Sequence, residues 1–530
     1  MDPTMRNEQT VTELWRMYRN GTTYQMRLGL PETVRTNVAF YEGEQWAPPT
    51  KATRNLPRPV VNLVRFVCRN KRARITLTPV RLTYRCDEDP ALAERFSRFA
   101  SYMTDRMRMA ELDARAVKDA LIKGSYCYQF YWQDDADGGG LQCELIDPLH
   151  VYFANPCETD EQKQDWIMIA SRMPLAAVRA LADAGVDLPY IRADREDALA
   201  EQDGSELCTV LTRYFRVDGR VYCERATRDV VLSAPFALSP APPDAGNHFA
   251  RVRTDLYPIV FGSYEEREGS IYGISEVEGV VPNQRIVNHI LGMEALAIQN
   301  SAWGKYVVTK DALKGQQISN EPGEVLVDYS VAGNGIRKLE HASLSGQPMH
   351  FVDSLVNLTR VLAGSSEIMT GEQLNNLSGT AIAQLQSQAN KPIEEVRERF
   401  WRAKERQGLV LLQCCLLYYD HLRWYDTDEE GVAHAEEYVA DDYRGVRMTV
   451  TVQACMGTGA TTAADVNLLE TLFARGAIDA LTFVRAYPDD ALCDKRTILR
   501  LVEGQMDRER AGADAQDASP MIPTVDIIDA

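Results

Sequence analysis

The sequence lacks the features that mark membrane-spanning and disulfide-bonded proteins. Its longest apolar run, Leu409–Tyr419, contains Gln413 and is far shorter than the ~20 residues that cross a bilayer. We therefore expect no membrane segment. The 11 cysteines include no Cys-x-x-Cys pair, and their scattered positions in a large chain favour reduced thiols over a disulfide framework.

Signatures of catalysis and of metal binding are missing as well. There is no GxxxxGK[ST], no HExxH and no GxSxG, and the seven histidines show no ligand spacing. The nearest metal-like pattern places acidic residues from Asp426 to Glu437 at EF-hand positions, but Glu430 stands where Asp or Asn is usual and strands flank the pattern. A hairpin loop is favoured there over a calcium site. We expect no enzyme, no catalytic residue, no cofactor and no metal.

Residues 51–85 contain no acidic side chain, although the whole chain has a net charge of −18. The basic residues in this segment bring its charge to +10, and they include Arg54, Arg58, Arg65, Arg69, Arg72 and Arg74. Charge that is segregated in this way usually faces a partner. An intersubunit salt-bridge surface is the favoured interpretation, contact with nucleic acid is the sharper alternative, and a solvated face is the third.

The stretch from Tyr272 to Asp420 predicts a helix, a compact β insert, a second helix, a glycine-rich loop and a very long helix. Ser275 and Glu278 form a capping box at the start of the first helix. The later pieces are strands at Tyr306–Thr309 and Glu324–Tyr329, a helix at Pro348–Ala363 and a loop at Thr370–Gly379. The long helix follows, and its ~38 residues would form a rod of about 57 Å.

The remaining sequence mixes helices and strands, and a chain of 530 residues can form three or four structural regions. The expected elements are an N-terminal arm with an amphipathic piece at Val11–Tyr18, helices at Val61–Arg74 and Pro90–Lys123, a hairpin of Tyr126–Trp132 and Leu141–Ile146, and a strand at Arg447–Ala454. Helices follow from Ala463.

This order of elements resembles the core of a tailed-bacteriophage portal protein, in which two stem helices bracket a clip and a tunnel loop leads into a long helix. Short motifs resemble the family too. They are the aromatic segment Phe40–Trp46, the entry to the first wing helix at Arg58–Val64, a strand and turn from Ile146 to Pro156, and the loop-to-helix junction Leu377–Ala381. The resemblance runs from Phe40 to Met506 and favours the portals of short-tailed phages.

The resemblance implies an α+β portal fold with a mixed α/β wing, a helical stem, a β-rich clip and a helical crown, assembled as a ring. The implied divisions are an N-terminal arm at 1–39, the first part of the wing at 40–271, a stem helix at 272–302, the clip at 303–349, a second stem helix at 350–369, the tunnel loop at 370–379, the long helix and wing return at 380–455, the crown at 456–510 and a disordered tail at 511–530.

The resemblance also implies a structural function in the virion. The chain would form a ring, a homododecamer as in the family, at one capsid vertex after assembly in the host cytoplasm, and double-stranded DNA would be packaged and ejected through it. Implied partners are the major capsid protein, the terminase and the tail connector proteins. Implied channel residues are Gly371, Asn375, Asn376, Ser378 and Gly379, and implied docking residues of the clip are Lys305, Lys310, Lys314, Arg337 and Lys338.

Two other functions stay open from the sequence. One is another head–tail adaptor or capsid structural protein, which would rarely contain so long a helix after a clip-like insert. The other is a DNA-packaging enzyme, and the absence of a Walker lysine argues against a motor of that kind.

Overall fold

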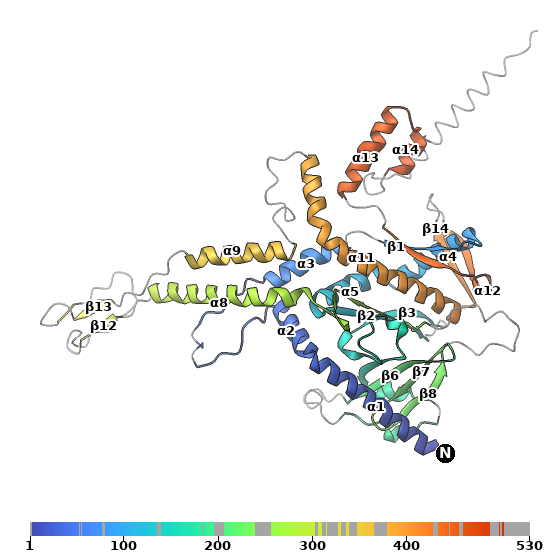
Figure 1. The fold of residues 1–530 in the computed structure, drawn as a ribbon, viewed down its shortest axis with the longest axis horizontal. Helices are drawn as coiled ribbons and strands as arrows, with labels where there is room; N and C mark the ends of the chain where they lie inside the picture. The colour runs from blue at the N-terminus through green and yellow to red at the C-terminus, as the bar shows by residue number, and fades with distance from the viewer. Residues whose placement is uncertain are drawn as a thin grey trace, which may run out of the picture.

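A computed structural model of the chain describes residues 3–51, 53–54, 56–76, 80–134, 139–183, 185–194, 206–238, 256–302, 306–309, 314, 327–329, 335–338, 347–364, 379–427, 433–444, 446–454, 459–487, 498 and 501–502. Helices and strands are mixed along these residues, and the strand pairings that they contain are antiparallel. The α+β class predicted from the sequence is therefore confirmed. Figure 1 shows a broad body from which a long helix pair extends.

A five-stranded sheet forms one side of the body, and the N-terminal helix covers it (Figure 1). Its strands, in spatial order, are β4 (Val151–Phe153), β5 (Trp166–Pro174), β6 (Leu207–Val217), β7 (Arg220–Ala226) and β8 (Val231–Ala237). Helix α1 (Pro3–Arg27) packs on this sheet because its Leu14 shares a buried cluster with Met168 and Leu211. The sequence predicts an arm with one short amphipathic piece here; the helix is longer on both sides of that piece.

A three-stranded sheet, in the order β3 (Gly140–Ile146), β2 (Ser125–Gln133) and β9 (Ile259–Ser263), lies next to it. The β2–β3 pairing confirms the predicted hairpin. The single helix predicted for 90–123 is wrong. The segment forms α4 (Pro90–Arg106) and α5 (Met109–Lys123), because Arg108 between them has a left-handed backbone with φ of 53°. Because of the break, α4 packs on β1 (Val80–Arg85) and β14 (His421–Thr427), while α5 packs on β2.

The C-terminal part of the body returns to its N-terminal half. Strand β1 (Val80–Arg85) pairs with β16 (Thr449–Ala454), which confirms the strand predicted there. Strands β14 (His421–Thr427) and β15 (Ala433–Val439) form a hairpin that leads into the short helix α12 (Ala440–Tyr443). Aromatic rings fill the space under α4: Phe99 stacks on Tyr438 with ring centres 4.3 Å apart, and Tyr438 stacks on Tyr443 at 5.2 Å.

Helix α11 (Gly379–Tyr418) has 40 residues, which confirms the predicted long helix. Figure 1 shows that it changes direction along its length, so it is not the straight rod of about 57 Å that the sequence predicts. Pro392 lies within the helix and has no N–H to donate to it, which is a usual cause of such a bend.

Three polar side chains at seven-residue intervals fasten α11 to β9 and the residues beside it. Arg399 Nη1 donates to the Tyr264 carbonyl at 2.9 Å, Arg406 Nη2 donates to the Phe261 carbonyl at 2.8 Å, and Gln413 Nε2 donates to the Leu256 carbonyl at 2.8 Å. Residues seven apart lie on one face of a helix. This face of α11 therefore binds main-chain atoms of its neighbour.

The projecting helices are α8 (Glu276–Ala302) and α9 (Gln347–Leu362), and a two-stranded ladder of β12 (Tyr306–Val308) and β13 (Ile336–Lys338) lies beyond them (Figure 1). The predicted strand at Tyr306–Thr309 is confirmed. The predicted strand at Glu324–Tyr329 is wrong where the structure describes it, because residues 327–329 are not a strand. Strand β12 pairs with β13. The other elements are α2 (Leu30–Glu42), α3 (Leu63–Thr76), α6 (Leu175–Ala180), β10 (Glu265–Arg267), β11 (Ser270–Ile274), α13 (Gly459–Ala474) and α14 (Ala480–Ala486).

Gly408 lies where α11 packs tightly on the β1–β16 pair, and we predict that a side chain at this position destabilises the fold. A Cβ at this position would lie 2.6 Å from Val450 Cγ1, so Gly408→Ala should destabilise the fold by about 1–3 kcal/mol through overpacking. Gly279 in α8 faces open space, so Gly279→Ala should stabilise by about 0.5–1 kcal/mol. Urea unfolding of both variants tests the pair, and equal effects would contradict the packing described here.

Candidate functional site

The helix pair α8–α9 is the most distinctive feature of the surface, and its two helices pack on each other near the body. Val287 and Val352 are buried between them together with Leu63 of α3. At about 1.5 Å per residue, the 27 residues of α8 extend about 40 Å, so most of its length stands clear of the sheets (Figure 1). The base of α8 must therefore fix the direction of the whole pair.

The predicted capping box holds the first turn of α8. The Ser275 N–H donates to Glu278 Oε1 at 3.0 Å, and the Glu278 N–H donates to Ser275 Oγ at 3.2 Å. Asn37 of α2 reaches the same cap, because its side-chain N–H groups bond Ser275 Oγ at 2.8 Å and the Ile122 carbonyl at 3.0 Å. One buried amide thus links α2, α5 and the start of α8.

An amide network of Gln45, Gln284 and Asn288 continues along the buried side of α8. Gln284 Oε1 accepts the Leu63 N–H at 2.8 Å, and Gln284 Nε2 donates to Asn288 Oδ1 at 2.9 Å and to the Val61 carbonyl at 2.8 Å. Asn288 Nδ2 then donates to Gln45 Oε1 at 2.7 Å. All three side chains are buried, so each bond that is lost would leave a polar atom without water.

A charged cluster of Lys71, Tyr264 and Glu276 completes the base of α8. Lys71 Nζ lies 2.8 Å from Glu276 Oε1, and the Tyr264 hydroxyl donates to Glu276 Oε2 at 2.7 Å. Burial, followed by the nearby Glu276 carboxylate, raises the pKa of Tyr264 far above its usual range. The same two causes raise the pKa of Cys68 to about 12, so this thiol stays protonated at neutral pH.

Two of the motifs that carry the sequence resemblance, Phe40–Trp46 and Arg58–Val64, meet beside α8. Trp46 Nε1 donates to the Pro59 carbonyl at 3.0 Å. The pair lies so close to α8 that a Cβ on Gly292 would stand 2.9 Å from the Pro57 carbonyl oxygen and 3.1 Å from the Trp46 ring. The aromatic segment Phe40–Trp46 and the segment Arg58–Val64 therefore both contact the projecting helix.

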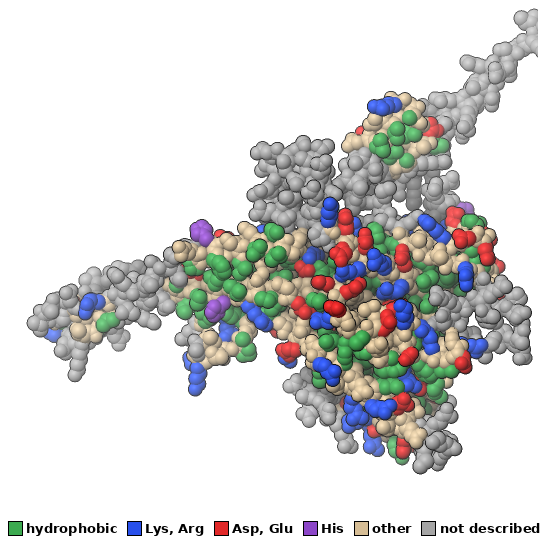
Figure 2. Space-filling view, in the orientation of Figure 1, with side chains coloured by type: hydrophobic (Ala, Val, Ile, Leu, Met, Phe, Trp, Pro, Cys, Tyr) green, Lys and Arg blue, Asp and Glu red, His purple; other side chains and the backbone are tan. Residues whose placement is uncertain are grey.

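The outer surface of the α8–α9 pair carries apolar stripes. On α9, Phe351, Leu358 and Leu362 are more than half exposed, and they recur at intervals of seven and four residues that put them on one face. On α8, Ile286 and Met293 are exposed and are also seven residues apart. Figure 2 shows hydrophobic side chains along this pair, whereas charges of both signs mix over the body. Exposed apolar stripes of this length mark contact surfaces.

The basic segment is only partly free of partners. Lys71 is buried in the charged cluster, and Arg65 donates to the carbonyls of Tyr41 at 2.9 Å and Glu42 at 2.8 Å. Arg69 is exposed on α3, whereas Arg72 and Arg74 are half-buried. Arg54 and Arg58 are exposed on the segment that leads into α3.

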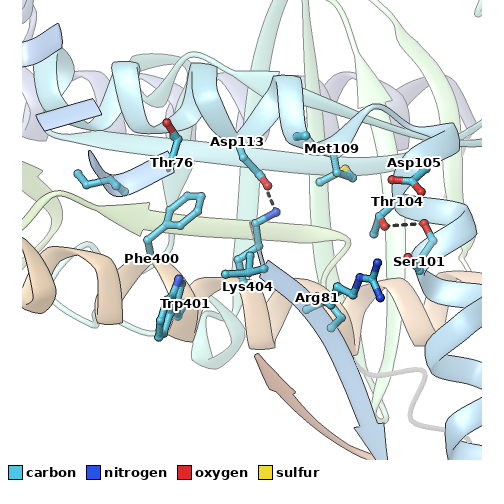
Figure 3. Close-up of a pocket in the computed structure, with 14 residues that line it drawn as sticks. Thr76, Arg81, Ser101, Thr104, Asp105, Met109, Asp113, Phe400, Trp401 and Lys404 are labelled. Carbon is cyan, nitrogen blue, oxygen red and sulfur yellow. Dashed lines mark hydrogen bonds and ion pairs between the residues drawn. The ribbon is translucent and has the colours of Figure 1, made fainter. Parts of the chain in front are cut away.

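A cavity of about 410 Å³ lies between α11, α5, α4 and β1. Figure 3 shows its central contact, an ion pair between Lys404 of α11 and Asp113 of α5. Asp113 also accepts the Tyr128 hydroxyl at 2.7 Å, and the Trp401 and Phe400 rings form one wall. Because Lys404 is buried, losing Asp113 would leave an uncompensated charge, so the pair fastens α11 to α5.

A second ion pair, between a partly exposed arginine and a buried carboxylate, joins α11 to the turn before β5. Arg406 Nε lies 3.0 Å from Glu161 Oε1, and the Glu161 side chain is fully buried. Burial raises the pKa of Glu161 to about 7, although Arg406 opposes the shift. This carboxyl is therefore a titratable group inside the core.

Several sequence-predicted site residues lie outside the described residues: Lys305, Lys310, Gly371, Asn375, Asn376 and Ser378. Gly379 is the first residue of α11. Near the tip of the projecting pair, Lys314 Nζ lies 5.0 Å from the centre of the Tyr329 ring. Arg337 and Lys338 lie on β13. The structure thus describes three of the five predicted clip residues and, of the predicted loop residues, Gly379 alone.

The EF-hand-like spacing falls on the β14–β15 hairpin. Asp426 pairs with His434, and Glu437 pairs with Arg423, so the two ends of the pattern lie on strands. Among the described residues, no group of three or more His, Cys, Asp or Glu side chains is arranged to hold a metal ion. Likewise, within the described part of the chain, none of the helices combines the length and apolar character that a bilayer crossing needs.

Sequence reasoning missed the amide network and both α11 ion pairs. Gln284 and Asn288 leave one local signal, since they stand four apart on an otherwise apolar face of α8. Glu161 and Arg406 leave none, because their contact joins segments far apart in the sequence.

Comparison with known protein families supports one of the interpretations left open by the sequence. Residues 216–440 match the model of the phage P22-like portal protein family. This match confirms the resemblance to tailed-bacteriophage portal proteins. The matched portal region extends from β6 to the first residue of α12 and contains α8, α9 and α11. Portal proteins are structural components of the phage capsid. A comparison with curated proteins finds no match.

The buried Glu161 predicts a pH dependence of stability. Its pKa is raised from 4.5 to about 7 in the fold, so between these values the folded chain binds more protons than the unfolded chain. Stability from this group therefore falls as pH rises through that window. Glu161→Gln removes the effect, so the stability of the variant relative to wild type should rise by about 1.4 kcal/mol per pH unit at most, and level off above about pH 7.

Urea unfolding of wild type and Glu161→Gln between pH 5 and pH 8 measures this difference. Glu158→Gln, three residues away and only half-buried, is the matched control for the change of residue type. A constant difference between Glu161→Gln and wild type across the range would show that Glu161 does not titrate there.

Proposed function

We propose that the chain assembles into a closed ring with a central channel at one capsid vertex, through which double-stranded DNA is packaged and later ejected. The observation that carries this proposal is the pair of apolar stripes on α8 and α9, which a monomer would leave in water. One stripe lies on each helix, so a copy can offer its α8 face to the α9 face of the next. Such a heterologous contact closes into a ring when its rotation allows.

The division of the chain expected from the sequence gives each part a role in this ring. We propose that α8 and α9 are the stem, that residues 303–349 form a clip at its far end, that α13 and α14 belong to a crown and that the sheets form a wing. The match of 216–440 to the portal family supports this division, since it contains the whole of both stem helices. The ring number we propose is twelve, by analogy with the family.

The docking partners are proposed on the same ground. A clip at the tip of the projecting pair would stand farthest from the body, so it is suited to binding the terminase during packaging and the tail connector afterwards. The exposed apolar residues Val307 and Tyr329 lie there beside Arg337 and Lys314, a mixture that suits a protein contact. The capsid protein would surround the wing.

The ring proposal predicts that charge on the α9 stripe prevents assembly. Leu358→Glu with Leu362→Glu places two carboxylates on side chains that we propose to be covered in the ring, so the variant should remain a folded monomer. Light scattering and class-averaged electron micrographs report the mass and the presence of a ring with a central hole.

Leu188→Glu is the matched control, because Leu188 is 45% exposed and lies between α6 and β6, outside the α8–α9 pair. The control should assemble as wild type does. A wild-type chain that is a stable folded monomer at all concentrations would refute the ring, and normal rings from the α9 variant would refute the stripe as the contact.

A second prediction concerns the proposed tunnel loop, residues 370–379. Its Gly371, Asn375 and Asn376 disfavour regular structure, and it joins α9 to α11. We propose that it projects into the channel. Deleting residues 375–377 should leave ring assembly intact and reduce the DNA content of particles made with the variant. Particles with a normal genome content would refute the channel role.

A further inference from the structure

Helix α3 has a buried face and a strongly cationic outer face. Val64, Val67 and Cys68 are packed inside, whereas Arg65, Arg69 and Arg72 stand at intervals of four and three residues on the other side. This stripe is about 10 Å long. A shallow groove of about 570 Å³ lies beside this stripe, and Arg65 and Arg69 line it.

The fold does not neutralise this stripe. Within the part of the chain that the structure describes, Arg65, Arg69 and Arg72 form no ion pair, and the bonds of Arg65 go to uncharged carbonyl oxygens. Residues 51–85 contain no carboxylate that could supply one locally. Like charges four residues apart also destabilise a helix, so the stripe lowers the stability of α3 itself.

The groove borders on the apolar end of α9. Arg360 of α9 lies over the Phe66 ring, 5.1 Å from its centre, which brings the last turn of α9 against α3. Leu358 and Leu362 are exposed on that turn. Guanidinium groups beside an apolar patch are typical of protein–protein contacts, in which arginine is enriched and the centre is apolar. A surface that binds only DNA phosphates has no need of the apolar part.

The rest of the chain supplies the complementary charge. Removing the ten positive charges of residues 51–85 from the net charge of −18 leaves −28 on all other residues. A second copy therefore presents many carboxylates, and a ring brings copies into contact repeatedly.

We propose that the outer face of α3, through Arg65, Arg69 and Arg72, binds an acidic face of a second copy of this chain. The proposal rests on the proposed ring and deepens it, because it assigns one of its contact surfaces. Guanidinium–carboxylate pairs would then fix the rotation between neighbours, while the adjoining α9 stripe contributes apolar contact.

Charge reversal tests this assignment. Arg69→Glu with Arg72→Glu should raise the protomer concentration needed for half-maximal assembly at least tenfold, as measured by analytical ultracentrifugation. The matched variant Arg69→Lys with Arg72→Lys keeps the charge and should assemble within about threefold of wild type. Added salt should narrow the gap between the two variants, because exposed charge pairs are screened. Circular dichroism of each variant confirms that the protomer is folded.

Zero-length crosslinking identifies the partner group. The ammonium introduced by Arg69→Lys can be coupled to a carboxylate by a carbodiimide, and rings made from mixed light and heavy-isotope chains distinguish crosslinks between copies from those within one. We expect crosslinks from position 69 to an aspartate or glutamate of another copy.

Three results would overturn the proposal. Charge-reversed protein that assembles as wild type does would exclude the face as a ring contact and leave the ring itself standing. Unchanged assembly with weaker binding of a fluorescent DNA duplex would make the face a nucleic-acid surface. A wild-type chain that never assembles would overturn the ring and this contact together.

Discussion

Buried side-chain amides at the base of α8 are the interactions on which the arrangement of the whole molecule depends. A helix of 27 residues that leaves the body can be tilted by small changes at its origin. Apolar packing alone would permit α8 to tilt, whereas hydrogen bonds between Gln284, Asn288 and Gln45 require particular distances and directions. Because these atoms are shielded from water, a displaced α8 would leave them unpaired. The direction of the α8–α9 pair is therefore a property of the core.

The cations of the molecule differ in their partners according to whether they are buried or exposed. The buried cations Lys71 and Lys404 each have a carboxylate partner, which the fold requires of charges away from water. The arginines on the outer face of α3 have no such partner within the described part of the chain. Paired charges thus serve the protomer, and the unpaired ones are available to neighbours.

Features with a local signal could be predicted from the sequence. Ser275 and Glu278 predict the start of α8, and the long apolar periodicity predicts α11. The break at Arg108 could not be predicted, because an arginine in the left-handed conformation carries no glycine or proline signal. The strand predicted at Glu324–Tyr329 is wrong at residues 327–329, because the pairing of short strands depends on contacts between distant residues, here those between β12 and β13. The pair of Glu161 and Arg406 likewise depends on tertiary contact alone.

The three polar side chains of α11 at seven-residue spacing have a mechanical consequence. Arg399, Arg406 and Gln413 each donate to a main-chain carbonyl, and successive side chains are two helical turns apart, about 10 Å along the helix axis. A smaller slip of the helix along its axis would break all three bonds together and offer no substitute. We therefore expect α11 and β9 to move as one rigid unit, so that a displacement of either element also displaces the other. Since the acceptors are main-chain oxygens, the three bonds themselves do not depend on the side chains of Leu256, Phe261 and Tyr264.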